Sequence, residues 1–324
     1  MAVMRILIAF PTSSTPGGNS KTANSWARAL TLLGHEVHLS THPGSPPADL
    51  LIAMHAEKSH EALIRFRAAN PKAPIVLALT GTDLYPELSE TSLTSLQLAD
   101  RLVVLQEKAL HRLPSRFQEQ TRVIYCVAPT PAIPSGRYEN TGGFTVCVVG
   151  HLRAVKDPLR TARASRLLPP QSAIRVLHAG AILDNEFHGE VDREHSENPR
   201  YQWLGQLSAQ EAQELIASSD LLSHTSSQEG GGSVLAEALM SETPIVASRN
   251  DATTSLLGDD YPGLFSFGNT ETLAALLSSC ESTPAFRESL LARAASHRWK
   301  CSETRALECW RPLLEELFPK RSSS

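Results

Sequence analysis

The sequence lacks several features that mark particular classes of protein. No apolar run reaches 18 residues, so no membrane-spanning helix is predicted. Basic residues are not in excess: 30 Lys and Arg stand against 34 Asp and Glu, and the formal charge of −4 excludes a nucleic-acid binder held by bulk positive charge. Aromatic residues make up only 6% of the 324 residues, which predicts a mostly aliphatic core.

Cysteine is scarce as well. The five cysteines are widely scattered and none belongs to a C-x-x-C pair, so neither a disulfide framework nor a structural zinc site is predicted. The first ten residues are too short and wrongly flanked for a secretory signal and are typical of a strand, so we expect a cytoplasmic protein. We expect every cysteine to be a small buried thiol: Cys126, Cys147, Cys280, Cys301 and Cys309.

What is present is an alternation of short β-rich runs with longer helical patterns. In the first part of the chain, this pattern predicts strands at 4–10, 36–40, 50–55, 75–80, 101–105 and 121–125, and helices at 19–33, 59–70, 93–99 and 107–113. Residues 127–143 are rich in proline and glycine and have almost no periodicity, which is typical of an interdomain linker.

The alternation then restarts. Strands are predicted at 144–150, 173–180, 201–204, 221–224 and 244–248, and helices at 157–168, 208–218, 233–240, 270–279, 284–297 and 302–318. Strand–helix alternation on both sides of a linker predicts an α/β protein with two doubly wound, Rossmann-like halves. Ligands of such folds bind at the carboxyl ends of the strands, so we expect the site in a cleft between the two halves.

The first candidate motif is the loop from Thr15 to Thr22, directly after the first strand. It ends in Lys-Thr like a phosphate-binding loop, but Ser20 stands where that loop needs glycine, and G-x-G-x-x-G is absent too. One interpretation is a plain turn. The other is a glycine loop that lets a phosphate or sugar approach the backbone and the start of the following helix.

The second candidate is the segment from Gly150 to Pro158, between a strand and a helix that Pro158 would start at its first turn. Arg153 and Lys156 lie three residues apart at the carboxyl end of the strand, where a phosphate would sit. The alternative is that both are solvated loop cations.

The third candidate is Glu229-Gly-Gly-Gly-Ser-Val-Leu-Ala-Glu237. Its glycines would expose backbone N–H groups at a helix N-terminus, which is a site for an anion. The two carboxylates are eight residues apart, so Glu229 in the loop and Glu237 on the helix can face one ligand. An ordinary helix start is the alternative interpretation.

The fourth candidate is Leu79-Thr-Gly-Thr-Asp-Leu-Tyr85, which follows a strongly hydrophobic strand. Thr80, Thr82 and Asp83 would line the cleft, although a helix cap is the alternative for Asp83. Other strand-end candidates are His55, Arg249 and Asp251. G-x-S-x-G and H-E-x-x-H are missing, so neither a hydrolase nucleophile nor a metal site is predicted, and no bound cofactor is expected.

Glu229-x7-Glu237, preceded by Gly150, Arg153, Lys156 and the N-terminal glycine loop, resembles the two-Rossmann-domain (GT-B) glycosyltransferases of the family 4 type. That family usually has Arg directly after the strand-end glycine, where this chain has His151. The chain also has no D-x-D pair, so phosphate charge would be neutralised by basic side chains and backbone N–H groups.

Finer features are similar to a narrower family, the selenosugar synthases (SenB) of selenoneine biosynthesis. The matching segments are 79–85, 99–106, 150–158, 198–205, 229–231 and 256–263. The resemblance implies transfer from a UDP-sugar, of the UDP-GlcNAc or UDP-glucose type, to selenophosphate. A C–Se bond would form and UDP and phosphate would be released. A functional link to other enzymes of that pathway is also implied.

The resemblance also implies domains and site residues. Residues 1–135 would form the acceptor-side domain, completed by a C-terminal helix at 302–320, and residues 142–300 the nucleotide-sugar domain. From the resemblance, catalytic roles are expected for Arg153, Lys156 and Glu229. From their places at strand ends, they are expected for His55 and Asp83. The donor would be bound by Gly17, Gly18, Asn19, Arg153, Lys156, Leu204, Gly231, Gly232, Ser233, Val234 and Glu237.

The selenophosphate site has no motif to transfer, so it is argued from chemistry. Selenophosphate is already an anion with an exposed selenium and needs no general base, but it needs cations beside another anion. The available candidates are Lys21, His55, His151 and Arg249. Two alternatives stay open: a GT-B transferase with a hydroxyl acceptor, and a non-catalytic nucleotide-sugar-binding module.

Overall fold

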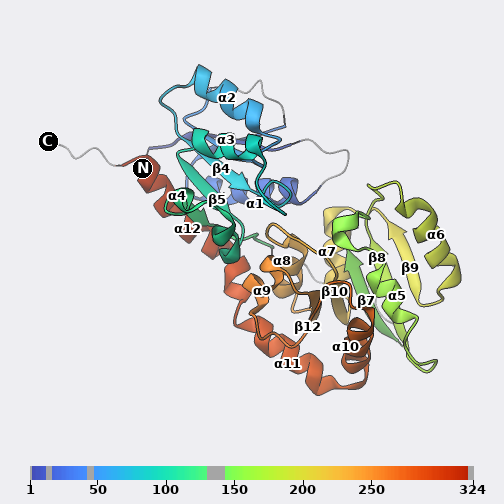
Figure 1. Cartoon of the computed structure of the whole chain (residues 1–324). Helices are drawn as coiled ribbons and strands as arrows, with labels where there is room; N and C mark the ends of the chain where they lie inside the picture. Colours follow the sequence, from blue (N-terminus) through green and yellow to red (C-terminus); the bar gives the residue numbers. More distant parts are fainter. Residues whose placement is uncertain (1, 12–16, 42–46, 130–142, 320–324) are drawn as a thin grey trace. The chain divides into compact units, whose positions relative to one another are not determined.

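The computed structural model of the chain describes residues 2–11, 17–41, 47–129 and 143–319. The chain divides into two compact units. Unit 1 consists of Met1–Ala128, Gly230–Ser233 and Lys300–Ser324, and unit 2 of Pro129–Glu229 and Val234–Trp299. Each unit is built on a parallel six-stranded sheet, which confirms the predicted α/β fold class (Figure 1). Most of the predicted linker, 130–142, lies outside the described residues.

The sheet of unit 1 has the strand order β2-β1-β3-β4-β5-β6. Every predicted strand is present, with ends that differ by two residues or fewer. The strands are β1 (Arg5–Ala9), β2 (Glu36–Ser40), β3 (Leu50–Met54), β4 (Ile75–Leu79), β5 (Arg101–Val104) and β6 (Thr121–Val123). The helices are α1 (Gly18–Leu32), α2 (His60–Ala69), α3 (Glu90–Leu98), α4 (Ser115–Gln118), α12 (Glu303–Leu317) and the 3-10 helix η1 (Glu107–Arg112).

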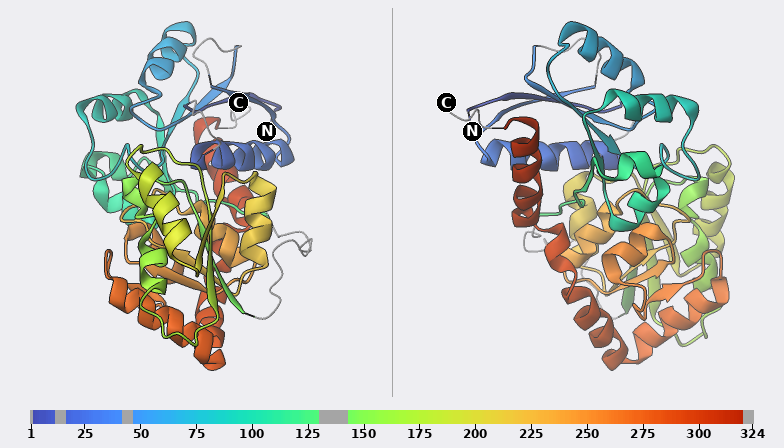
Figure 2. Two further views of the ribbon diagram at one scale, coloured as in Figure 1. Left: turned by 90° about the vertical axis from the view of Figure 1, so that its right-hand side faces the viewer. Right: turned by 60° about the vertical axis from the view of Figure 1, so that its left-hand side comes forward.

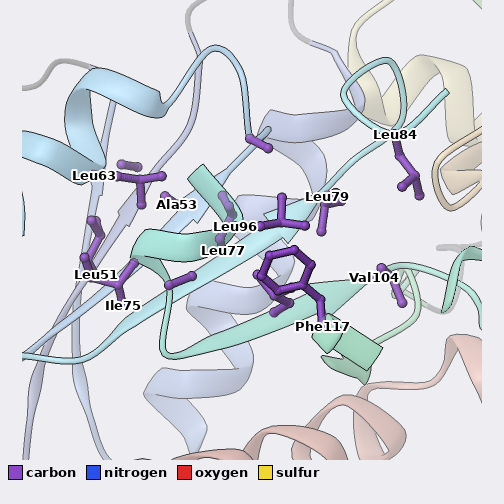
Figure 3. Close-up of a cluster of buried hydrophobic side chains, with 14 of the residues drawn as sticks. Leu51, Ala53, Leu63, Ile75, Leu77, Leu79, Leu84, Leu96, Val104 and Phe117 are labelled. Atoms are coloured by element: carbon purple, nitrogen blue, oxygen red, sulfur yellow. The ribbon is translucent and has the colours of Figure 1, made fainter. Parts of the chain in front are cut away.

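The central strands β3 and β4 are buried at every position. Parallel strands that are covered by helices on both faces consist of continuous apolar residues, as these do. Leu51, Leu77 and Leu79 pack with Leu96 of α3 and Phe117 of α4 in one hydrophobic cluster (Figure 3). This rigid centre carries the loops that follow β3 and β4.

The C-terminal helix α12 packs against α1 within unit 1 (Figure 2). The Trp310 ring meets the Trp26 ring edge-on, with centroids 5.1 Å apart. At the far end of the helix, Glu316 accepts hydrogen bonds from Arg122 of β6 and Arg101 of β5. A helix distant in sequence therefore completes the N-terminal unit.

The sheet of unit 2 has the order β12-β11-β10-β7-β8-β9. Its strands are β7 (Phe144–Val149), β8 (Ile174–Ala179), β9 (Tyr201–Gly205), β10 (Leu221–His224), β11 (Ile245–Ser248) and β12 (Leu264–Phe265). Its helices are α5 (Arg160–Ser165), α6 (Phe187–Glu197), α7 (Ala209–Ala217), α8 (Ser233–Met240), α9 (Asp251–Leu257), α10 (Thr270–Ser282), α11 (Pro284–Ala295) and the 3-10 helix η2 (Ala154–Lys156). The first residue of α8, Ser233, belongs to unit 1.

The structure departs from the predicted elements at a few places. The predicted helix at 157–168 is shorter, because Asp157 has a left-handed φ of 44° and α5 begins only at Arg160, beyond Pro158. The helix α6 was not predicted, since only Phe187 and Val191 of it are buried and no apolar stripe marks it. The helix α9 and the two-residue strand β12 were also not predicted, and the segment at 107–113 is a 3-10 helix.

Two sequence expectations concern single features. Four of the five cysteines are buried, whereas Cys309 is half-buried, and all five are free thiols. No helix within the described ranges has both the length and the apolar composition needed to cross a membrane. The roles of the two predicted domains, acceptor side and nucleotide-sugar side, stay predictions.

Candidate functional site

Hydrogen bonds join two loops of unit 2, the loop after β7 and the loop after β10; we call this set of bonds the clasp. The Thr225 hydroxyl donates to the carbonyl oxygens of Lys156 at 2.9 Å and Asp157 at 3.0 Å. Ser227 donates to the Val155 carbonyl through its backbone N–H at 2.9 Å and its hydroxyl at 3.0 Å. Three consecutive carbonyl groups of the basic loop are thus fixed by the loop that leads to Glu229.

This clasp brings Lys156 and Glu229 into direct contact. Lys156 Nζ lies 2.5 Å from Glu229 Oε1, and the two side chains are 30% and 11% exposed. His224 Nε2 lies 3.2 Å from the same oxygen. Burial by itself would raise the pKa of Glu229, but Lys156 and His224 outweigh it and hold that pKa well below its usual range. Glu229 is therefore an ionised carboxylate beside a cation.

Arg153 precedes Lys156 on the same loop and is about half exposed. Asp184, from the loop after β8, accepts the Ala154 N–H at 2.8 Å, and its other oxygen lies 3.9 Å from Arg153 Nε. Asp184 therefore fixes the backbone at Arg153 and leaves the guanidinium accessible. An exposed guanidinium of this kind can bind a phosphate with two hydrogen bonds.

His151 lies at the same strand end, but its geometry favours a neutral ring. Its Nδ1 accepts the Ala181 N–H at 3.1 Å, so the ring carries its proton on Nε2 while that bond is present. The backbones of Gly150 and Gly180 approach closely here. A Cβ at Gly180 would lie 1.9 Å from the Gly150 carbonyl oxygen, so no larger residue fits.

A small cavity lies beneath these loops. Its lining includes Gly150, Lys156, His178, His224 and Ser226, all from unit 2. His178 is fully buried and donates from Nε2 to the Gly150 carbonyl, which leaves Nδ1 to accept from the Tyr201 hydroxyl at 2.8 Å. Burial lowers the pKa of His178 to about 4, so its ring is neutral at pH 7.

The remaining candidates of unit 2 are dispersed. Leu204 is half-buried in β9, and Glu237 is buried on α8. Arg249 is half exposed and its guanidinium donates to the Asp259 carbonyl at 3.0 Å. Asp251 is the first residue of α9, after the Asn250 cap. None of these interactions ties the four residues to the Lys156–Glu229 pair, so their predicted roles stay predictions.

The glycines after Glu229 belong to unit 1 and are needed there for space. A Cβ at Gly230 would lie 1.9 Å from the Thr80 carbonyl oxygen, and one at Gly231 would lie 2.5 Å from Leu105 Cβ. Gly232 has a φ of 63°, which suits glycine. The predicted donation to phosphate from Gly231, Gly232, Ser233 and Val234 stays a prediction. Close packing within unit 1 is a second reason for glycine at these positions.

Asp83 of unit 1 is buried and occupied by backbone groups. Its carboxylate accepts the N–H groups of Thr80 at 2.9 Å, Gly81 at 2.8 Å and Ala56 at 2.8 Å. Three charge-assisted hydrogen bonds tie the loop after β4 to the loop after β3. In this structure, Asp83 has the geometry of a residue that positions two loops, which is a broader role than the predicted cap.

His55 directly follows β3 in a strained conformation, with a φ of 75° and 4% of its surface exposed. Its Nε2 lies 3.1 Å from the Thr82 hydroxyl oxygen, and its Nδ1 accepts the Lys58 N–H at 3.3 Å. Burial lowers the pKa of His55, although the Asp83 charge opposes this effect. The ring is therefore a neutral donor to Thr82. Such strain is typical of functional sites.

The N-terminal glycine loop is only partly described, because Thr15 and Pro16 lie outside the described residues. Gly17 caps α1, and Gly18 is its first residue. The Gly17 carbonyl accepts from the Ser20 hydroxyl at 2.8 Å and the Lys21 N–H at 3.2 Å. Asn19 and Lys21 are half-buried in this first turn.

Sequence reasoning missed two residues at the site, His224 and Asp184. His224 is the last residue of β10, so its strand-end position was a signal that went unused. Asp184 lies in the loop between β8 and α6, and no sequence pattern linked it to Arg153. Within the described part of the chain, no group of three or more His, Cys, Asp or Glu side chains is arranged to hold a metal ion.

Residues 132–297 match the family described as glycosyl transferases group 1. No curated protein matches the chain by sequence.

Several solved structures share the fold. HepE of Anabaena, solved in complex with UDP and glucose, is 20% identical, with a TM-score of 0.73 over 97% of this chain and 100% of its own. A glycosyltransferase of Rickettsia africae is 13% identical, with a TM-score of 0.78 over 99% and 100%. Sucrose-phosphate synthase of Thermosynechococcus elongatus is 16% identical, with a TM-score of 0.75 over 97% and 99%.

Proposed function

The chain belongs to the glycosyl transferases of group 1, and on this premise we propose that it transfers a sugar from a UDP-sugar to selenophosphate. The donor would be of the UDP-GlcNAc or UDP-glucose type. The observation that carries the donor half is the Lys156–Glu229 pair at the strand ends of unit 2. HepE, which shares the fold, was solved with UDP and with UDP-glucose.

The chemistry of the donor explains the need for a cation at this position. When the bond between the sugar and the diphosphate breaks, negative charge develops on the β-phosphate and positive charge on the sugar. Lys156 and Arg153, fixed through Ser227, Thr225 and Asp184, would stabilise the leaving diphosphate as preorganised cations. The ionised Glu229 would accept hydrogen bonds from the sugar hydroxyls.

The acceptor half of the proposal rests on the resemblance to selenosugar synthases and on unit 1. A hydroxyl acceptor would benefit from a nearby base, but both oxygens of Asp83 already accept backbone N–H groups. The Nδ1 atom of His55 accepts the Lys58 N–H. Selenophosphate needs no base. Its oxygens need donors, which the exposed Thr82 hydroxyl supported by His55 would provide, with Lys21 of the same unit as a cation.

The proposed reaction has two steps. A selenium lone pair forms the C–Se bond at the anomeric carbon while the C–O bond to the diphosphate breaks, and its electron pair leaves with UDP. Water then attacks phosphorus, and the P–Se bond breaks with its electron pair on selenium. The products are the 1-selenosugar, UDP and phosphate.

The test is identification of the product. The protein is incubated with UDP-GlcNAc or UDP-glucose, with and without selenophosphate, and products are analysed by mass spectrometry for the selenium isotope pattern. A sugar-linked selenium product that needs both substrates is expected, and Glu229→Gln should strongly reduce it. Sugar transfer to a hydroxyl compound without selenium would establish the conventional transferase instead. No consumption of any UDP-sugar would favour a binding module.

A further inference from the structure

His224 is a buried histidine whose Nε2 is unusually placed. Its side chain is 6% exposed, and Nε2 lies 3.2 Å from Glu229 Oε1. Among the residues that the structure describes, no hydrogen bond with proper alignment reaches this nitrogen. A buried polar atom without such a bond is costly, and its presence calls for an explanation.

The Lys156 ammonium would have to bind two different anions. In this structure it neutralises Glu229, whereas the proposed function requires it to hold the diphosphate of the donor. Movement of the ammonium toward the diphosphate would leave the Glu229 carboxylate, which is 11% exposed, with less compensation. An uncompensated buried charge is strongly unfavourable, so another group must replace Lys156.

We infer that His224 becomes the cationic partner of Glu229 when the donor diphosphate draws Lys156 away, and that it takes up one proton from solvent as it does so. This inference rests on the proposed function of Lys156 as the donor's phosphate ligand. The proton comes from water outside the site and binds the imidazole. No covalent bond between heavy atoms changes. His224 is then a positioning residue, because it acts on the sugar through Glu229.

The surrounding groups leave His224 as the place for that proton. The titratable groups that face it are Lys156 from η2, Glu229 from the loop after β10 and His178 from β8 across the cavity. Lys156 is the cation that is paired with Glu229 before the donor binds. His178 cannot accept a proton without breaking a bond, because Nε2 donates to Gly150 and Nδ1 accepts from Tyr201. Protonation of Glu229 itself is the alternative, and a substitution distinguishes the two.

The experiment is a calorimetric titration with UDP-glucose, with UDP-GlcNAc as a second probe, in buffers of different ionisation enthalpy. These probes carry no phosphate group that titrates near pH 7. A dependence of the binding enthalpy on the ionisation enthalpy of the buffer therefore reports protons bound or released by the protein. We expect net proton uptake on binding by the wild-type protein. His224→Gln should bind with that uptake abolished, and His188→Gln, at an exposed position of α6, should keep it.

The pH dependence of the wild-type affinity gives a second readout that needs no variant. One proton taken up on binding makes the dissociation constant fall by up to about tenfold for each unit of decreasing pH. Binding with no proton uptake, or uptake unchanged in His224→Gln, overturns the inference alone. Failure of both UDP-sugars to bind overturns the proposed donor and the inference with it.

Discussion

The two units present different chemistry at the carboxyl ends of their strands. In unit 2, the loops after β7 and β10 carry Arg153, Lys156 and Glu229, which are charged side chains with partial access to solvent. In unit 1, the loops after β3 and β4 are held by Asp83, whose buried carboxylate accepts hydrogen bonds from three backbone N–H groups. What faces outward there is a neutral hydroxyl, Thr82, supported by His55.

This contrast shows that similar Rossmann-like sheets can use a carboxylate in opposite ways. The Glu229 carboxylate remains available because side-chain cations balance it, and side chains can move. Asp83 is fixed because backbone groups balance it, and they cannot move without unfolding a loop. Under the proposed function, the donor diphosphate would enter the ion pair of unit 2, whereas the acceptor would meet a preformed loop of unit 1.

The largest expected effect comes from removing the cation of unit 2. We expect Lys156→Ala to reduce kcat at saturating donor by a factor on the order of 10² to 10³, because the charge on the leaving diphosphate loses its stabilisation. Binding of UDP should weaken far less. Steady-state kinetics together with calorimetry measure both effects.

Two controls accompany this prediction. Lys156→Arg keeps the charge and should retain part of the turnover, and Lys72→Ala, at an exposed position of unit 1, should leave it unchanged. Turnover by Lys156→Ala at the wild-type level would mean that the leaving diphosphate is stabilised by other groups.

The next effect concerns the packing of unit 1. Gly230→Ala places a methyl group 1.9 Å from the Thr80 carbonyl oxygen. Because this neighbour is a backbone atom, only a movement of the backbone could relieve the clash. We expect a loss of roughly 2–4 kcal/mol in the free energy of unfolding, measured by denaturant titration. Gly189→Ala is the matched control, since nothing lies within 4 Å of its Cβ and it lies in α6. An unchanged stability of Gly230→Ala would show that this loop does not pack as described.

The buried histidine of unit 2 gives a prediction about pH. The folded-state pKa of His178, about 4, lies below its ordinary value of 6.5, so the unfolded state binds the proton more readily. Its contribution to stability is complete above about pH 6.5 and is lost as the pH falls toward 4, to a total of roughly 3 kcal/mol. Unfolding titrations at several pH values should show a shallower acid slope for His178→Gln than for wild type. His188→Gln should keep the wild-type slope, and equal slopes in all three proteins would refute the assignment.

The smallest predicted effect tests the buried carboxylate of unit 1. Asp83→Asn replaces a charged acceptor of three N–H groups by an amide with one oxygen. We expect a loss of about 2 kcal/mol in stability, measured by thermal and denaturant unfolding. Glu87→Gln on the exposed part of the next segment should have no measurable effect. If Asp83→Asn were as stable as wild type yet inactive, a direct chemical role for Asp83 would replace the positioning role.

Much of the fold could be predicted because apolar runs and helix punctuation are local signals. The strand β4, with the sequence Ile-Val-Leu-Ala-Leu, is buried at all five positions, as a parallel strand covered on both faces should be. The helix α6 could not be predicted in this way, since it buries only Phe187 and Val191 and its remaining residues are polar.

The site was harder to predict because its geometry depends on distant contacts. The spacing of Lys156 and Glu229, 73 residues apart, gives no sign that a Thr225 and Ser227 clasp would join them. The predicted strand at 221–224 ends correctly at His224, but nothing in the sequence indicated that this side chain contacts Glu229. The hydrogen bonds of Asp83 could not be predicted either, because one donor, the Ala56 N–H, comes from the loop after the neighbouring strand β3.

The most direct measurement is UDP release in a coupled assay, with the wild-type protein and a UDP-sugar, in the presence and absence of selenophosphate. The account predicts that release depends on selenophosphate and that phosphate and selenosugar form in equal amounts with UDP. It also predicts that Lys156→Ala slows the formation of all three by the same large factor. UDP release that is the same without selenophosphate, or that instead follows the addition of a hydroxyl acceptor, would contradict it.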